Sequence, residues 1–211
     1  MGLDPLAILS IFSPERPRAR GSRLALAAVW VGVGLWGFSN LRGADTPQRQ
    51  ATEWELKAAY LVNFVRYVKW PPSRFESAKT PFVIGVLGEN SFGPMLEEFL
   101  KKSGEVRGRS LALRVCKTAD EASGCHVVYL SESIKNDLDA VLTALKGKKL
   151  LTVSDIEGST RKGAVCRFYL QDRKIRFEIN LDAVRRAELM VDPKLLKLAT
   201  VIEELPKTEE K

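Results

Sequence analysis

The sequence is poor in the residue types on which most catalytic and metal centres depend. Its 211 residues include one histidine and three cysteines, and His126 directly follows Cys125 at the start of an apolar run. Neighbouring residues of a strand point to opposite faces, which disfavours a shared metal ion or a Cys–His nucleophile. Gly85, Gly88 and Gly93 lack the spacing of a nucleotide-binding loop, and no Gly-Lys-Ser or Gly-Lys-Thr follows them. We therefore expect a non-enzymatic protein that uses no cofactor.

The chain also lacks a strong excess of one charge in its globular part. The net charge is +7, from 33 basic and 26 acidic residues. The first 44 residues hold five arginines against Asp4 and Glu15, so the remainder has 28 basic and 24 acidic residues, a net charge of +4. A weak positive charge spread along the sequence does not indicate a nucleic-acid partner. The densest basic runs, 146–149 and 173–176, are typical of solvated edges.

The N-terminal extension carries a compartment signal. An arginine-rich segment precedes the uncharged apolar run 24–38, which is the arrangement of a secretory signal. The run is short for a membrane span, which needs about 20 apolar residues. Ala44 suits the last position before cleavage. Arg42, however, stands where a small residue is preferred, so an uncleaved membrane anchor stays open. We predict a basic N-terminus with a signal or anchor over 1–44, a linker over 45–52, an exported domain over 53–205 and a charged tail over 206–211.

The exported part alternates between helical and strand patterns. Residues 53–70 repeat apolar side chains at helical spacing until Pro71 and Pro72 end the helix, and further helices are predicted over 92–102 and from Ser131 or Ser133 to 145. Apolar runs bounded by turn residues predict strands over 82–87, 111–115, 127–130, 150–153, 164–170 and 174–181. The last two strands are close enough to form an antiparallel hairpin. We expect an α/β fold, a single-domain sandwich with a mixed, roughly six-stranded sheet flanked by helices.

The last predicted strand leads directly into a helix. Between 174 and 181, apolar side chains alternate with Arg176, Glu178 and Asn180, which predicts one face on the core and one polar face. Asn180 or Asp182 is suited to accept the first free N–H groups of the next helix. The polar face is either solvated or a contact surface, and we favour solvent.

Three cysteines in an exported domain allow one disulfide and leave one thiol over. Cys166 shares a strand face with apolar residues and fits a buried apolar filler. Cys116 and Cys125 are then the natural pair. However, Cys116 ends one strand and Cys125 precedes another, and parallel neighbours would hold their α-carbons beyond the limit of about 7 Å. The disulfide between Cys116 and Cys125 therefore stays open.

Polar and turn-forming residues follow two of the predicted buried strands. Gly88, Asn90 and Ser91 come after the first strand, and Ser154 and Asp155 come after the fourth. The carboxyl ends of parallel strands meet at one edge of a sheet, where ligands bind. These five residues are candidate ligand contacts, with ordinary turns and helix caps as the alternative interpretation.

Five motifs occur in order along the domain: KAAYLVNFVRYVKWP at 57–71, FVIGVLG at 82–88, GCHVVYLS at 124–131, LTVSD at 151–155 and RFEINLD at 176–182. Together they resemble the YfiR family of periplasmic proteins over about Thr52 to Ile202. The resemblance implies a non-enzymatic protein, since the best-understood members repress an inner-membrane diguanylate cyclase and so restrain cyclic di-GMP and biofilm formation. It also implies dimers and internal disulfides. Cys125 and Cys166 match positions that are paired in some members, whereas Val83 and Ser159 stand where their partners would be.

From this resemblance we predict a periplasmic regulatory protein that binds the sensory part of an inner-membrane signalling protein and represses it. The expected partner is a diguanylate cyclase or a sensor kinase, and a homodimer is a further expectation. The candidate partner surface comprises Arg176, Glu178, Leu189 and Leu195. The alternative function is a periplasmic small-molecule binding module that uses the strand ends near Gly88 and Asp155.

Overall fold

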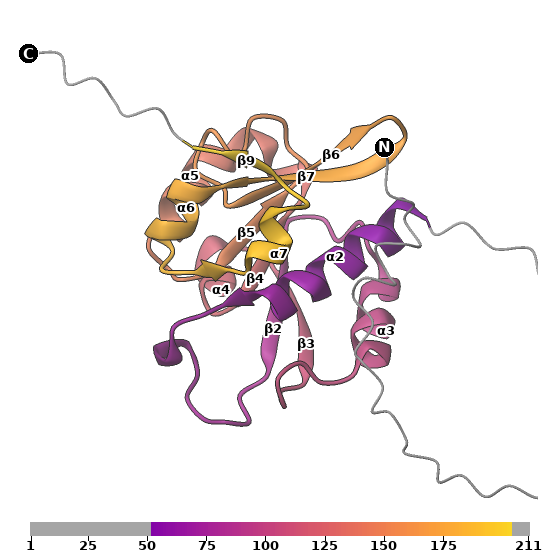
Figure 1. Cartoon of the computed structure of the whole chain (residues 1–211), viewed down its shortest axis with the longest axis vertical. Helices are drawn as coiled ribbons and strands as arrows, with labels where there is room; N and C mark the ends of the chain where they lie inside the picture. Colours follow the sequence, from indigo (N-terminus) through magenta and orange to yellow (C-terminus); the bar gives the residue numbers. More distant parts are fainter. Residues whose placement is uncertain (1–51, 204–211) are drawn as a thin grey trace, which may run out of the picture. The chain divides into compact units, whose positions relative to one another are not determined.

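The computed structural model describes residues 52–203 (Figure 1). The predicted signal or anchor over 1–44, the charged tail over 206–211 and all of the linker except Thr52 lie outside these residues. The predictions for those segments remain predictions.

The described part begins with helix α2 (Glu53–Tyr67). A reciprocal capping box starts the helix: the Thr52 hydroxyl accepts the N–H of Glu55, and the Glu55 carboxylate accepts the N–H of Thr52. The sequence predicted a helix to residue 70, but Val68 is extended and α2 ends before it. Strand β1 (Val68–Lys69) instead pairs with β8 (Met190–Val191), and the short 3-10 helix η1 (Pro72–Arg74) follows.

A seven-stranded sheet forms the centre of the domain, in the order β3-β2-β4-β5-β6-β7-β9. Its strands are β2 (Phe82–Leu87), β3 (Leu111–Cys116), β4 (Val127–Leu130), β5 (Leu151–Ser154), β6 (Cys166–Gln171), β7 (Lys174–Asn180) and β9 (Thr200–Ile202). Every neighbouring pair is parallel except β6 and β7, which form an antiparallel hairpin. The predicted α/β fold with a mixed sheet is confirmed. The sequence missed β9, β1 and β8 because two or three residues are too few to show an alternating pattern.

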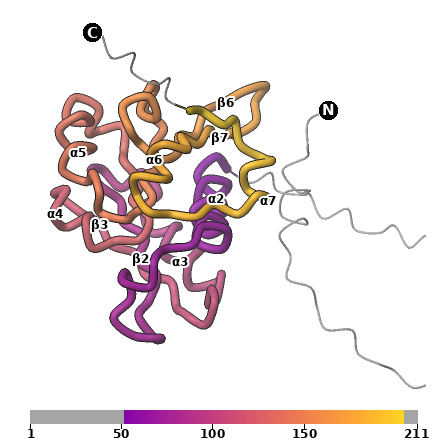
Figure 2. Tube along the Cα trace, turned by 60° about the vertical axis from the view of Figure 1, so that its left-hand side comes forward, coloured from indigo at the N-terminus to yellow at the C-terminus, as the bar shows by residue number. Residues whose placement is uncertain are grey.

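Helices cover both faces of this sheet (Figures 1 and 2). One face is covered by α2, α3 (Pro94–Ser103) and α7 (Pro193–Leu196). We call it the aromatic face, because Tyr60 and Phe64 of α2 pack on Phe168 and Phe177 with ring centroids 5.4 to 5.8 Å apart. Aromatic rings that meet at such distances add to the stability that their buried area provides.

The opposite face is covered by α4 (Ala119–Ser123), the 3-10 helix η2 (Glu132–Asp137), α5 (Leu138–Leu145) and α6 (Leu181–Arg186). We call it the thiol face, because Cys116 and Cys125 lie there in the apolar cluster that contains Val128 and Leu142. Successive side chains of β2 point to opposite faces. Val83 and Leu87 therefore lie on the thiol face, while Phe82 packs on Trp70 and Phe75 of the aromatic face.

Candidate functional site

A buried lysine lies at the carboxyl edge of the sheet, on the aromatic face. Lys57 of α2 is 5% exposed, and its Nζ lies 2.5 Å from Glu53 Oε1 and 2.5 Å from Asp155 Oδ2. Glu53 precedes Lys57 by one helical turn, and Asp155 directly follows β5. The Tyr129 hydroxyl of β4 donates to the same Asp155 oxygen at 2.7 Å. We call Glu53, Lys57, Tyr129 and Asp155 the lysine cluster.

The Tyr129 phenol stays protonated and acts as a donor within this cluster. Burial raises its pKa far above the ordinary value, and the neighbouring Asp155 carboxylate raises it further. The Lys57 ammonium also lies 4.4 Å from the centre of the Trp54 ring, and Trp54 and Phe92 both meet the Tyr129 ring edge on. Aromatic rings therefore flank a buried lysine that is paired with two carboxylates.

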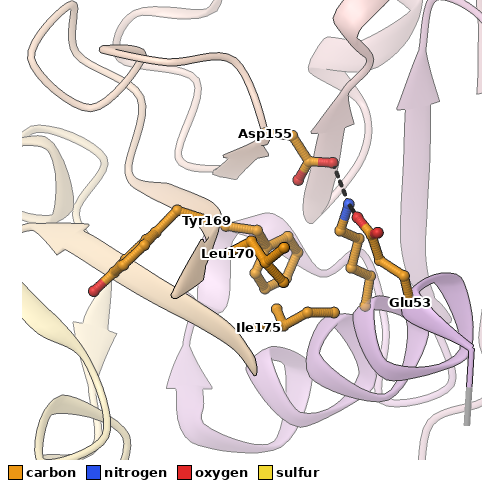
Figure 3. Close-up of a pocket in the computed structure, with 7 residues that line it drawn as sticks. Glu53, Asp155, Tyr169, Leu170 and Ile175 are labelled. Carbon is orange, nitrogen blue, oxygen red and sulfur yellow. Dashed lines mark hydrogen bonds and ion pairs between the residues drawn. The ribbon is translucent and has the colours of Figure 1, made fainter. Parts of the chain in front are cut away.

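A small cavity of about 160 Å³ opens beside the lysine cluster (Figure 3). It is lined by Glu53, Lys57, Asp155, Phe168, Tyr169, Leu170 and Ile175. Figure 3 shows the Tyr169 ring pointing away from the charged group. Asp155 Oδ1 is buried and has no hydrogen-bond partner within residues 52–203. A buried carboxylate oxygen without a partner is unfavourable, so this oxygen is the unsatisfied acceptor of the residue that lines the cavity.

Of the five candidate ligand contacts, only Asp155 lines this cavity. Ser154 is fully buried, and its hydroxyl donates to the Leu130 carbonyl and accepts the Ile156 N–H, as in a turn. Asn90 closes its own loop, since its Oδ1 accepts the N–H of Phe92. Gly88 adopts φ of 95° next to Ser133, and Ser91 is exposed.

Sequence reasoning missed Glu53, Lys57 and Tyr129 as members of a site. One signal was present: Lys57 lies beside Ala58 and three residues after Trp54, within the apolar stripe of the predicted helix. A lysine in such a stripe is buried only if it is paired. Its partner Asp155 is 98 residues away in sequence, so the pair itself could not be read from local spacing.

The polar face of β7 is not solvated as predicted. Glu178 is 9% exposed and accepts hydrogen bonds from Arg167 Nε at 2.7 Å and from the Thr160 hydroxyl at 2.5 Å. Burial raises the pKa of Glu178, but the Arg167 and Thr160 hydrogen bonds and the Arg161 charge outweigh it and leave the pKa below its ordinary value. Asn180 is fully buried, donates to the Thr160 carbonyl and caps α6 through the N–H of Ala183. The segment before β6 therefore covers this face.

Three further residues of the candidate partner surface also have little or no free surface. Leu189 and Leu195 are 5% and 1% exposed and belong to the core. Arg176 is half-buried, and its Nε has no hydrogen-bond partner within the described residues. The apolar spacing of the C-terminal segment therefore reflects core packing and not an exposed docking face.

The Cys116 and Cys125 side chains meet across strand β2. Their Sγ atoms lie 4.0 Å apart, and both residues are buried thiols in this structure. A β-carbon on Gly85 would lie 2.7 Å from Cys125 Sγ and 3.5 Å from Cys116 Sγ, so the missing side chain makes room for both sulfur atoms. Burial, followed by the neighbouring Cys116, raises the pKa of Cys125 to about 12, which disfavours the reactive thiolate. Their disulfide stays a prediction, and Cys166 is buried elsewhere.

His126 has a structural role. It is 2% exposed, its Nδ1 accepts the N–H of Val83 at 3.1 Å, and its ring stacks on Phe75. Burial, followed by the charge of Arg74, lowers the pKa of His126 to about 4, so the imidazole is neutral at physiological pH. Within residues 52–203 no three histidine, cysteine or acidic side chains gather as metal ligands. The helices of the same part are all too short or too polar to span a bilayer.

A comparison with protein families identifies the chain. A family model described as YfiR/HmsC-like matches residues 54–200, from the first turn of α2 to the start of β9. The chain belongs to the YfiR/HmsC-like family. The resemblance that the five motifs indicated is thus confirmed. The match includes all of the lysine cluster except Glu53, together with the cysteine pair and the β6–β7 hairpin.

Two solved structures are similar at a low level. One is a conserved domain protein from Vibrio cholerae O1 biovar eltor, with 14% identity and a TM-score of 0.42 over 58% of this chain and 55% of that one. The other is an ABC domain in complex with L-Trp from Streptococcus pneumonia, with 13% identity and a TM-score of 0.42 over 57% and 56%. The chain thus spans little more than half the length of each. Neither similarity bears on function at this level.

Proposed function

We propose that this YfiR/HmsC-like domain is a periplasmic, non-enzymatic regulator that binds the sensory part of an inner-membrane signalling protein and represses it. The observation that carries the proposal is the family match over residues 54–200. The partner is a diguanylate cyclase in the first instance and a sensor kinase in the second. Repression follows if the domain binds the inactive conformation of its partner more tightly than the active one, because a ligand shifts an equilibrium only by differential affinity.

The exposed tip of the β6–β7 hairpin is the docking surface that we assign to this partner. Leu170 is 67% exposed, and it lies beside the cavity of the lysine cluster (Figure 3). An exposed leucine at the edge of a cavity gives a partner both an apolar contact and a recess to fill. This surface replaces Leu189 and Leu195, which are buried, and keeps Arg176 at its border, since Arg176 pairs with Tyr169 across the hairpin.

Co-purification from membranes tests this proposal. The full-length protein should capture a membrane cyclase, and Leu170→Asp should reduce that capture at least tenfold. Val115→Asp is the matched control, because Val115 is also an exposed strand residue, at 53%, on the distant edge strand β3. Equal capture by both variants would reject the hairpin as the surface, and no captured signalling protein at all would reject the regulatory role.

A second candidate function is small-molecule binding, and the cavity lined by Asp155, whose Oδ1 has no partner among the described residues, favours it. A ligand with a small ammonium or hydroxyl donor would satisfy this oxygen. A panel of small primary amines should then raise the melting temperature of the protein, and Asp155→Asn should abolish the rise. No rise with any amine, or an equal rise in Asp155→Asn, would reject this function.

A homodimer in the periplasm is the assembly that we propose for the domain. Cell fractionation should place the protein with periplasmic markers, or with inner-membrane markers if its N-terminal segment is retained. Light scattering of the purified protein should give twice the mass of its single chain, which is 23.5 kDa for all 211 residues. A monomer across the micromolar range would reject the dimer without affecting the regulatory role.

A further inference from the structure

A second and larger cavity lies on the thiol face, away from the lysine cluster. Its volume is about 500 Å³, and it lies between the C-terminal end of α5, the turn that follows α5 and helix α6. Four cationic side chains form its rim: Lys146, Arg161, Lys162 and Arg186. None of its lining residues is acidic. Such a cavity presents an electrostatic environment for a negatively charged guest.

The floor of this cavity is apolar. It is formed by Leu142, Leu145, Leu150, Val165, Ala183 and Ala187, all of them largely buried. Ala183 lies in α6, and Ala187 is the residue that ends this helix. Their small side chains leave space that a leucine would fill. Thr152 is the one uncharged polar residue of the strands that lines the cavity, and its hydroxyl already accepts the Val165 N–H at 2.8 Å.

The acidic groups near the rim already have cationic partners. Asp139 pairs with Lys162 at 2.9 Å, and Glu188 pairs with Lys149 at 2.8 Å. Asp182 pairs with Arg185 at 2.6 Å. Within the described residues, Lys146 and Arg161 form no ion pair, although the charge of Arg161 acts on the buried Glu178. Lys146 and Arg161 therefore bring positive charge to the rim outside the ion pairs of the described residues.

We propose that this cavity binds a small organic anion with an apolar body. The anionic head would lie between Lys146 and Arg161, and the apolar body would cover Leu142, Ala183 and Ala187. Arginine suits this role because its planar guanidinium donates two parallel hydrogen bonds to a carboxylate or phosphate. This site is separate from the hairpin surface, because it shares no lining residue with the cavity beside Leu170.

Three probes, tested for binding to the full-length protein, distinguish the contribution of the ligand's anionic head from that of its apolar body. Octanoate carries both an anion and an apolar chain, inorganic phosphate carries only an anion, and octylamine carries the chain with the opposite charge. Isothermal titration should show octanoate binding at least tenfold more tightly than either of the other two. Equal affinity for octylamine would mean a merely apolar site, and equal affinity for phosphate would mean a merely cationic one; either result overturns the proposal.

Charge variants locate the site. Arg161→Glu should weaken octanoate binding at least tenfold, whereas Lys148→Glu should change it less than twofold, because Lys148 is an exposed neighbour that does not line the cavity. Ala187→Met should also abolish binding by filling the floor, and its melting temperature shows whether it still folds. Equal losses in Arg161→Glu and Lys148→Glu would indicate attraction by general surface charge and overturn the assignment. Binding confined to phosphatidylglycerol vesicles, with none for octanoate, would do the same and identify a membrane surface instead.

Discussion

The two faces of the sheet handle buried polar groups in different ways. On the aromatic face, Lys57 is buried with two carboxylates and a phenol around it, and His126 is held neutral by its burial. On the thiol face, the strands bury two thiols and keep their cations at the rim of a cavity. Each face therefore buries an ion pair, Lys57 with its carboxylates on the aromatic face and Glu178 with Arg167 on the thiol face, but the thiol face adds a cavity with cations at its rim and an apolar floor.

The largest effect expected on the aromatic face comes from His126. Its pKa is about 4 in the folded protein against an ordinary value of 6.5, so between these pH values the unfolded chain binds a proton that the folded protein does not. The free energy of unfolding should thus fall by about 3 kcal/mol as the pH falls from 6.5 to 4. Urea unfolding across this range measures the slope. His126→Asn, which offers an oxygen to the Val83 N–H, should remove most of it; an unchanged slope in the variant would assign the effect to other groups.

On the thiol face, Gly85→Ala tests the close packing. The new methyl group would lie 2.7 Å from Cys125 Sγ, so we expect a loss of about 1 to 3 kcal/mol in the free energy of unfolding. Gly124→Ala is the control, since its methyl group would approach only the flexible end of Arg114, at 3.0 Å. The loss at Gly85 should shrink in a Cys125→Ala background. Similar losses in both backgrounds would show that the sulfur atom is not what limits the space.

The charge matching of the aromatic face predicts unequal contributions from the two carboxylates of Lys57. The Asp155 side chain is 22% exposed and the Glu53 side chain 57% exposed. Asp155→Ala removes the buried partner and should cost about 1 to 3 kcal/mol, whereas Glu53→Ala breaks a surface pair and should cost less than about 0.5 kcal/mol. Thermal or urea unfolding of the two variants measures both costs. Equal costs would mean that Lys57 does not depend on Asp155.

The smallest effect concerns the turn of the β6–β7 hairpin. Asp172 and Arg173 both adopt positive φ, at 51° and 59°, which is the conformation of a two-residue turn that favours glycine in its second position. Arg173→Gly should therefore raise the free energy of unfolding by up to about 1 kcal/mol. Lys174→Gly, in the regular strand next to it, should lower it by a similar amount. A loss of stability in Arg173→Gly would indicate that the arginine side chain makes a contact worth more than the strain.

Local patterns in the sequence predicted much of the fold. Continuous apolar runs located β2 and β4, alternation located β7, and the structure selects Asn180 from the two predicted caps, Asn180 and Asp182. The same alternation gave the wrong environment for Glu178, because it does not show that Arg167, the cross-strand neighbour on β6, and Thr160, from the segment before β6, bind this carboxylate. A polar strand face is buried whenever another segment supplies its hydrogen bonds.

The candidate site was harder to predict because its members meet only through the fold. Asp155 was expected at a strand end, but Lys57 and Tyr129 come from α2 and β4. The cysteine pair shows the same limit. The sequence did not show that β2 lies between the strands of Cys116 and Cys125 and carries Gly85 between them, which lets the two Sγ atoms approach to 4.0 Å.

The level of cyclic di-GMP in cells tests the proposed regulatory role most directly. Deleting the gene should raise cyclic di-GMP and biofilm formation, the wild-type protein should restore both, and Leu170→Asp should fail to restore them although it folds and is exported. An unchanged cyclic di-GMP level in the deletion strain, in cells that produce the membrane cyclase captured with the protein, would contradict the account.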